Sequence, residues 1–224
     1  MEKTRKLIII GDSAFAEIAY EYFTYDSVYE VVGFSVEKAF LKRDHCCGLP
    51  IIPFEELEAY FSPSEHEFFA AITYAQLNRL RARLYRAAKA RGYKPASYVS
   101  SRAFVWRNAE IGEHCFIFES NVVQPFVKIG DNVVLWSGNH IGHHSNIGDN
   151  CFISSHVVVS GFVNMGANCF VGVNTTFANN ISIGQDCLFG AGSLVARDVP
   201  EDKVMKAEAG EPSGSARRFN RIRE

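Results

Sequence analysis

The sequence lacks an excess of charge of either sign. Its 224 residues carry 23 Lys and Arg against 25 Asp and Glu, a formal net charge of −2 with neutral histidines. Nucleic-acid-binding proteins usually have a basic patch and a high isoelectric point, so the charge balance argues against nucleic acid as a partner. The apolar content of 47% and the charged content of 21% are ordinary for a soluble globular protein.

The sequence also lacks a long apolar run. Basic residues precede residues 7–10, LIII, which gives the start a superficial likeness to a signal peptide. This run is far too short for a signal-peptide core or a membrane span. We therefore expect a buried first strand in a cytoplasmic protein with no membrane partner. In that compartment the six cysteines are expected to be free thiols.

A period of six residues runs through the second half of the chain. Every sixth residue from Val105 to Val195 is apolar, sixteen positions without an interruption, which chance would produce on the order of once in 10⁴–10⁵ trials. The next position in each six favours glycine. This period fits neither a helix nor a strand and is typical of hexapeptide β-helix repeats, in which each hexad forms a short strand and a turn. We expect about five three-sided coils with caps at their ends.

Residues eighteen apart should stack in successive coils. Cys115, Val133, Cys151, Cys169 and Cys187 share the fifth hexad position, which predicts an inward-facing column. A metal site is a poor interpretation because coils about 4.8 Å apart stack these thiols instead of arranging them tetrahedrally. A disulfide between adjacent coils fits the geometry but not the compartment. Asparagine tolerates the left-handed conformation of turns, so turns are predicted at Asn108, Asn132, Asn146, Asn150, Asn164, Asn168 and Asn180.

The first hundred residues have a different pattern. Strand-like segments at 6–10, 29–35 and 67–73 alternate with helix-like segments that end near residue 23 or cover 53–61 and 75–92, which predicts a small parallel α/β domain. In such folds a ligand lies beyond the carboxyl ends of the strands, often with a phosphate at the first helix N-terminus. The loop of Gly11, Asp12, Ser13, Ala14 and Phe15 has that place, with Ser13 a candidate phosphate donor or merely a helix cap.

The predicted organisation is an α/β domain over residues 1–98, a β-helix over 99–200 and a basic tail over 201–224. Residues 94–101 form a short hinge without a low-complexity linker, so the two domains should pack closely. The tail is expected to cap the last coil or contact coenzyme A phosphates, with solvated charge as the alternative.

The two halves together resemble a known family. LIIIGDSAFAEIA, VVGFS and GLPII, followed by the hexads, are similar to the sialic acid O-acetyltransferase and bacillosamine N-acetyltransferase family of sugar acyltransferases over nearly the whole chain. The resemblance implies a Rossmann-like domain that holds the nucleotide of a nucleotide-linked sugar, followed by a left-handed β-helix, against the usual crossover hand. It also implies a homotrimer with acetyl-CoA between adjacent β-helices.

The resemblance assigns the catalytic base to His143, five residues before the glycine that opens the next hexad. Imidazole, whose ordinary pKa is near 6.5, suits removal of a proton from an amine or hydroxyl that attacks a thioester directly. Where the family has an acidic residue after the base, this chain has His144, and Trp136 replaces an asparagine-containing segment and implies a reshaped acceptor pocket. Ser35 stands where the family often has an acid that recognises base or ribose, so the nucleotide is left open between UDP, dTDP and GDP.

The eighteen-residue spacing places His143, Gly161, Asn179 and Arg197 in one column. We expect the last three to serve the thioester, pantetheine and phosphate of acetyl-CoA; the alternative is two turn residues and a solvated charge. His140 and His156 belong to other places in the coil, although a neighbouring subunit could supply His156. His45, His66 and His114 are expected at the surface.

The function expected from the resemblance is N-acetylation, with acetyl-CoA, of a nucleotide-linked 4-amino-4,6-dideoxyhexose for surface-glycan biosynthesis. O-acetylation of a sugar is the alternative within the family. A γ-carbonic-anhydrase-type zinc enzyme is disfavoured because that family lacks the N-terminal domain and pairs histidines five residues apart, a spacing absent here. No metal is therefore expected. A non-catalytic scaffold is disfavoured by the glycine-flanked His143 and by the loop at Gly11.

Overall fold

The computed structural model describes residues 2–207, which begin with a six-stranded sheet. Its strand order is β3-β4-β2-β1-β5-β6, and every pair is parallel except the β3–β4 hairpin. Burial of the run at residues 7–10 on both sides of the sheet explains why β1 is wholly apolar there. The strands are β1 (Arg5–Ile10), β2 (Tyr29–Val36), β3 (His45–Cys46), β4 (Leu49–Pro53), β5 (His66–Ala70) and β6 (Lys94–Pro95).

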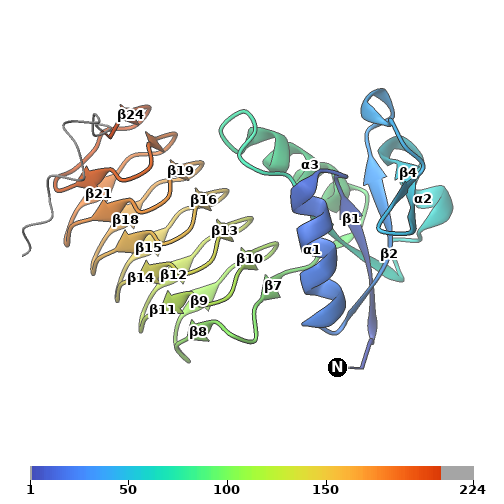
Figure 1. Cartoon of the computed structure of the whole chain (residues 1–224), viewed down its shortest axis with the longest axis horizontal. Helices are drawn as coiled ribbons and strands as arrows, with labels where there is room; N and C mark the ends of the chain where they lie inside the picture. The colour runs from blue at the N-terminus through green and yellow to red at the C-terminus, as the bar shows by residue number, and fades with distance from the viewer. Residues whose placement is uncertain (1, 208–224) are drawn as a thin grey trace, which may run out of the picture.

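Helices cover both faces of this sheet (Figure 1). α1 (Ala14–Tyr25) packs through Phe15, Ala19 and Phe23 into a cluster shared with the β-helix. α3 (Arg79–Ala90) packs with the short helices η2 (Phe54–Glu56) and α2 (Leu57–Tyr60) on the other face, and η1 (Lys38–Phe40) follows β2. The predicted α/β fold is confirmed.

The remainder is a three-sided parallel β-helix, seen as a stack of short strands in Figure 1. Face one is a seven-stranded sheet, face two a six-stranded sheet and face three a five-stranded sheet. Face one contains β7 (Tyr98–Val99), β10 (Phe116–Ile117), β13 (Val134–Leu135), β16 (Phe152–Ile153), β19 (Phe170–Val171), β22 (Leu188–Phe189) and β24 (Val204–Met205). Face two contains β8 (Phe104–Val105), β11 (Val122–Val123), β14 (His140–Ile141), β17 (Val158–Val159), β20 (Thr176–Phe177) and β23 (Leu194–Val195). Face three contains β9 (Glu110–Ile111), β12 (Lys128–Ile129), β15 (Asn146–Ile147), β18 (Asn164–Met165) and β21 (Ser182–Ile183).

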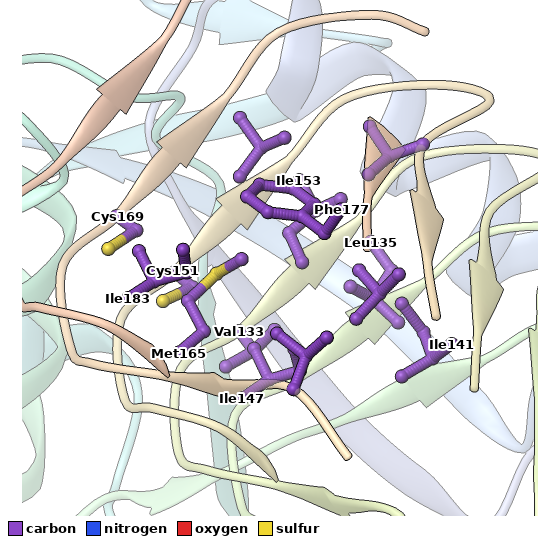
Figure 2. Close-up of a cluster of buried hydrophobic side chains, with 14 of the residues drawn as sticks. Val133, Leu135, Ile141, Ile147, Cys151, Ile153, Met165, Cys169, Phe177 and Ile183 are labelled. Carbon is purple, nitrogen blue, oxygen red and sulfur yellow. The ribbon is translucent and has the colours of Figure 1, made fainter. Parts of the chain in front are cut away.

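The period of six and the spacing of eighteen are both confirmed by the strand register. Val134 pairs with Phe152 and Ile141 pairs with Val159, each eighteen residues along the chain. The first hexad residues and the cysteine column fill the interior, which Figure 2 shows with Cys151 and Cys169 among aliphatic side chains. Each of the four column cysteines is 0% exposed and is a free thiol. The fold is the expected left-handed β-helix.

Most turns use a left-handed residue at the fourth hexad position, although Asn108 lies in a turn without a positive φ. Asn132, Asn150, Asn168 and Asn180 have φ between 58° and 61°, as predicted from their tolerance of this conformation. The prediction was wrong for Asn146 and Asn164, which occupy the sixth position and lie in β15 and β18. Side chains alternate along a strand, so these two asparagines point outward from face three while Ile147 and Met165 point inward.

The three faces differ in what covers their outer side. On face one, Phe116, Val134 and Phe152 are buried in the cluster that includes α1, and Figure 1 shows this face turned toward α1 and α3. Face three presents polar side chains such as Glu110 and Lys128. Face two is apolar and uncovered in the described chain: Leu194 is 70%, Phe104 52% and Val158 39% exposed.

Polar side chains fasten the α/β unit to the corner between faces three and one. Arg81 of α3 is 0% exposed and donates to the backbone oxygens of Asn132, Asn150 and Cys151. Asn78 donates to the backbone oxygens of residues 168 and 169. Burial without a carboxylate partner lowers the pKa of Arg81 to about 10, so this guanidinium is held by carbonyl dipoles.

Two histidines expected at the surface are buried. His114 is 0% exposed, accepts a hydrogen bond from the Ala70 N–H at 2.8 Å and lies 2.8 Å from Asn132 Oδ1. His66 is 8% exposed, with its Nδ1 3.0 Å from the Ser62 carbonyl. The hexad pattern marks His114 as a turn residue, but the α/β unit covers that corner. His45 is exposed, as expected.

The chain departs from the hexad register near Pro200. β24 pairs with β22 through Leu188 and Val204, sixteen residues apart instead of eighteen. The unit containing the α/β sheet ends with β6 at Pro95, and the β-helix begins with β7 at Tyr98. These two strands occupy half of the hinge expected over residues 94–101. Most of the basic tail, residues 208–224, lies outside the described residues.

Candidate active site

A pocket of about 300 Å³ opens at the carboxyl ends of β1 and β2. Gly11, Asp12, Ser13 and Ser35, four of the predicted substrate residues, line it. The Gly11 N–H donates to the Ser35 carbonyl at 2.7 Å, which joins the two strand ends. Within residues 2–207 the Ser35 hydroxyl is buried and has no hydrogen-bonding partner. A buried polar atom of this kind is costly unless a ligand or water satisfies it, so the pocket beside Ser35 is a candidate binding site.

The β1–α1 loop presents its backbone to this pocket. Ser13 is the N-cap of α1, and its carbonyl accepts from the N–H groups of Ala16 and Glu17. Within the described chain its hydroxyl makes no capping hydrogen bond, so this hydroxyl is free for a ligand. Ala14 is exposed, whereas the Phe15 ring is 2% exposed in the shared cluster. Phe15 can therefore serve a ligand only through its backbone.

The pocket also contains residues that the sequence reasoning missed. Glu37 directly follows β2 and accepts two hydrogen bonds from Arg83, at 2.8 and 2.7 Å. These hydrogen bonds lower the pKa of Glu37, against a smaller effect of burial. Gln76 and Phe40 complete the polar and aromatic lining. An acidic residue just after β2 is a recognisable signal in the sequence, but the resemblance placed the expected acid at Ser35, two residues earlier.

His143 lies at the corner between faces two and three, with its side chain exposed. Its ring rests on Gly161 of the next coil: a Cβ at Gly161 would lie 2.7 Å from His143 Cε1 and 2.9 Å from Nε2. The His143 backbone N–H donates to Gln124 Oε1 at 2.9 Å. Glycine at position 161 is therefore what allows the imidazole to lie flat against the corner.

His144 is held beside His143 by aromatic stacking. Its ring stacks on Phe162 with centroids 4.8 Å apart and on Phe126 at 4.6 Å, with interplanar angles of 15° and 27°. The two Nδ1 atoms of His143 and His144 are 3.2 Å apart. Only one of these atoms can carry the shared proton when both rings are neutral, so the protonation of one imidazole fixes the tautomer of the other.

The rest of the predicted column continues along this corner. Asn179 Oδ1 accepts from the Gly161 N–H at 2.9 Å, which fixes the glycine beneath His143. Arg197 is exposed and lines a hollow of about 570 Å³ that also includes Lys203. Three coils separate Arg197 from His143, a rise of about 14 Å at ordinary strand spacing.

Other predicted residues lie elsewhere. Trp136 is at the corner between faces one and two, where its ring packs on Phe15 and Phe118 with centroids 5.5 and 4.1 Å away. Trp136 and His143 are thus at different corners of one coil. His140 lies in β14, and His156 packs on Gly138 at the Trp136 corner. Both histidines thus lie away from the His143 corner, as expected.

The described residues give no support to a metal site or a membrane span. Within residues 2–207, no group of three or more His, Cys, Asp or Glu side chains is placed to hold a metal ion. No described helix is both long enough and apolar enough to cross a bilayer.

Comparison with known proteins identifies the repeat and the fold. Residues 108–143 and 126–161 match the bacterial transferase hexapeptide (six repeats) family, and residues 180–196 match the hexapeptide repeat of succinyl-transferase. No curated protein sequence matches this chain. These matches confirm the predicted hexapeptide repeat.

Solved structures share the whole two-part architecture. The acetyltransferase domain of PglB from Neisseria gonorrhoeae, in complex with acetyl coenzyme A, is 21% identical with a TM-score of 0.81, covering 94% of this chain and 100% of that one. PerB from Caulobacter crescentus, in complex with CoA and GDP-perosamine, is 22% identical with a TM-score of 0.80, covering 90% and 94%. WeeI from Acinetobacter baumannii is 16% identical with a TM-score of 0.60, covering 90% and 96%. This chain has the fold of these proteins.

Proposed function

We propose that this protein is an N-acetyltransferase that transfers the acetyl group of acetyl-CoA to the amine of a nucleotide-linked 4-amino-4,6-dideoxyhexose. The observation that carries the proposal is the seating of His143 on Gly161, beside His144, on a fold shared with acetyl-CoA and GDP-perosamine complexes. A place in surface-glycan biosynthesis follows from the proposed substrate, since nucleotide-linked sugars are donors for glycan assembly. The balanced charge and the absence of a spanning helix among residues 2–207 agree with a cytoplasmic enzyme.

In the proposed reaction His143 is the general base. Its Nδ1–H donates a hydrogen bond to His144 Nδ1. The Nε2 lone pair of His143 is then free to take a proton from the attacking amine. The nitrogen forms a bond to the thioester carbonyl, the C–S bond then breaks, and the thiol of coenzyme A leaves with a proton. His144 takes over the orienting part that an acidic residue plays in the resembling family, and Phe126 and Phe162 keep its ring in place.

Acetyl-CoA is proposed to lie along the corner that His143 and Gly161 share. Asn179 and Arg197 follow upward on the same corner, and Arg197 is placed to meet a phosphate. The thioester would then lie near His143 and the charged end near the last coil. The nucleotide of the acceptor belongs in the pocket lined by Gly11, Asp12, Ser13 and Ser35.

A second copy of the chain is part of the proposal. The α/β unit covers face one, and the corner of faces two and three is opposite that face in a three-sided prism. The pocket belongs to the α/β unit over face one and His143 lies at the opposite corner, so we infer that the base that meets the acceptor comes from a second copy. Face two is apolar, with Phe104, Val158 and Leu194 exposed, and its burial between copies in a homotrimer would bring the Trp136 corner of one copy, with His156, toward the His143 corner of the next.

The test is acetyl transfer from acetyl-CoA to GDP-, UDP- and dTDP-linked 4-amino-4,6-dideoxyhexoses, followed by mass spectrometry of the sugar. Thiol release is measured with DTNB against a blank without acceptor, because Cys47 is an exposed thiol that will itself react. His143→Ala should lower the rate of acetyl transfer at least about 100-fold. His45→Ala, which alters another exposed histidine, should leave this rate unchanged.

Each outcome is informative. A gain of one acetyl group on one sugar nucleotide, lost in His143→Ala, supports the proposal and identifies the nucleotide. Full activity in His143→Ala would remove the base assignment. Transfer only to hydroxyl acceptors would make the protein a sugar O-acetyltransferase, and no transfer to any acceptor would contradict the proposed activity.

A further inference from the structure

The loop that joins β2 to β3 runs beside the pocket at the ends of β1 and β2. Its first residue, Glu37, is fixed by Arg83, and its Phe40 lines the pocket with 63% of the residue exposed. An aromatic ring left in solvent at the mouth of a cavity has no packing role that explains it. Such a ring is a natural platform for a nucleobase, since every base has a face that stacks on aromatic side chains.

The far end of the same loop reaches the N-terminus of α1. Arg43 Nε lies 3.3 Å from Asp12 Oδ2, and Arg43 Nη2 donates to the Asp12 carbonyl. Nη2 is also 3.4 Å from Glu17 Oε1. The Arg43 side chain is 42% exposed in these contacts. Ion pairs this exposed contribute little to stability, so the guanidinium can exchange one anionic partner for another at small cost.

The charges around α1 explain why such an exchange is needed. The N-terminus of a helix attracts anions through its free N–H groups and dipole, yet Asp12 and Glu17 put two carboxylates beside it. Arg43 is the cation that the structure shows between them. The buried, unpartnered Ser35 hydroxyl in the adjoining pocket independently indicates that a ligand belongs there.

We propose that residues 37–43 form a nucleotide clamp, in which Phe40 packs against the base and Arg43 leaves Asp12 to bind the diphosphate of the substrate. A guanidinium matches two phosphate oxygens with two parallel N–H donors, whereas Arg43 meets the Asp12 carboxylate at a single 3.3 Å contact. The clamp rests on the proposed function, because it assigns the parts of the nucleotide within the acceptor pocket.

The clamp separates two contributions to affinity that titration calorimetry can measure. Dissociation constants are determined for GDP, UDP and dTDP and for the corresponding nucleosides, with the nucleosides measured by competition. Arg43→Ala should weaken the best diphosphate by about 10- to 100-fold and the nucleoside by less than about 2-fold. Phe40→Ala should weaken both by a similar factor, about 5-fold or more.

Two matched variants control for loss of surface charge and surface ring. Arg5→Ala removes an exposed arginine paired with Glu67 at the opposite end of β1. Tyr60→Ala removes an aromatic residue that is 59% exposed on α2. Neither should change any of the dissociation constants by more than about 2-fold.

The double variant Asp12→Asn with Arg43→Ala tests the exchange itself. If Arg43 binds the diphosphate, the double variant will keep most of the loss of diphosphate affinity seen in Arg43→Ala. Recovery of wild-type affinity would show that Arg43 only neutralises Asp12, and would overturn the clamp. Wild-type affinity in Arg43→Ala, or unchanged nucleoside binding in Phe40→Ala, would also overturn it. A wild-type protein that binds no nucleoside diphosphate would overturn the clamp and the proposed function together.

Discussion

His114 makes the stability of this protein depend on pH in a way that one substitution can remove. The Ala70 N–H donates to His114 Nε2, and Nδ1–H donates to Asn132 Oδ1, so both ring nitrogens are satisfied only when the imidazole is neutral. Burial is the main reason that the pKa of His114 is lowered to about 3, and the nearby Arg81 cation adds to the effect. Protonation of Nε2 would set two N–H donors against each other.

The sign and the size follow from this lowered pKa. In the unfolded chain the pKa of a histidine is about 6.5, so the unfolded state binds the proton first. The favourable contribution is therefore present above about pH 6.5 and is lost as the pH falls toward about 3. Between about pH 7.5 and about pH 4.5 the loss amounts to ~2.6 kcal/mol, from 2.303RT per pH unit over the interval in which only the unfolded state is protonated.

His114→Asn is the variant that isolates this effect. Residue 114 has φ of 57°, which asparagine tolerates, and asparagines fill the same position in the next coils. Asn132 Nδ2 donates to Asn150 Oδ1 at 2.8 Å, so an asparagine at 114 can donate to Asn132 in the same manner. Loss of the ring and of the Ala70 contact should cost about 2–4 kcal/mol at pH 7.5.

The assay is urea unfolding of wild type and His114→Asn at both pH values and one fixed protein concentration. The gap in unfolding free energy between the two proteins should narrow by ~2.6 kcal/mol at the acidic pH. Carboxylates destabilise both proteins alike in acid and cancel from this gap. A gap that stays constant across the pH range would mean that His114 is not a buried neutral imidazole, and the reasoning would be refuted.

Three further predictions concern the proposed reaction. Gly161→Ala places a Cβ 2.7 Å from His143 Cε1 and should lower kcat by about 10- to 100-fold with nucleotide affinity unchanged; an unaltered kcat would show that the ring need not rest on Gly161. His144→Ala should lower kcat by about 10-fold and His144→Asp should restore most of it, whereas equal rates in the two variants would deny His144 an orienting part. Arg197→Ala should raise the KM for acetyl-CoA by about 5-fold or more without changing kcat, and an unchanged KM would remove Arg197 from the site.

The β-helix was predictable because its period is written in the chain without an insertion. Each coil repeats the same backbone, so sixteen apolar positions and the spacing of Cys151 and Cys169 determine the interior and the register together. The same regularity placed His143, Gly161 and Asn179 on one corner, and the contacts of Gly161 with its two neighbours are found there. Because every coil has the same length, the spacing of two residues in the sequence is enough to predict whether they stack at the same corner.

What spacing could not give is the identity of the covered face. His114 and Trp136 both occupy turn positions within the repeat, yet His114 is buried against Phe69 and the half-buried Trp136 ring packs on Phe15. Both contacts come from the α/β unit. This unit is held on the β-helix by side chains such as Arg81, which is more than fifty residues from its partners Asn132 and Asn150 along the chain. Long-range burial has no local pattern, so the repeat alone placed His114 at the surface and gave no sign that Trp136 packs on the α/β unit.

The acidic residue of the pocket shows the same limit at closer range. Ser35 lies within β2, and the strand continues to Val36 before Glu37 reaches the pocket. The carboxylate is there, but Arg83 from α3 already takes both of its oxygens. A nucleotide therefore meets a neutral pair and not a free anion at this point. Discrimination between bases then depends on neutral hydrogen-bonding groups such as the unpartnered Ser35 hydroxyl and the Gln76 amide. Both groups can donate as well as accept. Replacing Ser35 with alanine should consequently narrow the difference in affinity between GDP, UDP and dTDP, since the base that satisfies the buried hydroxyl loses that advantage.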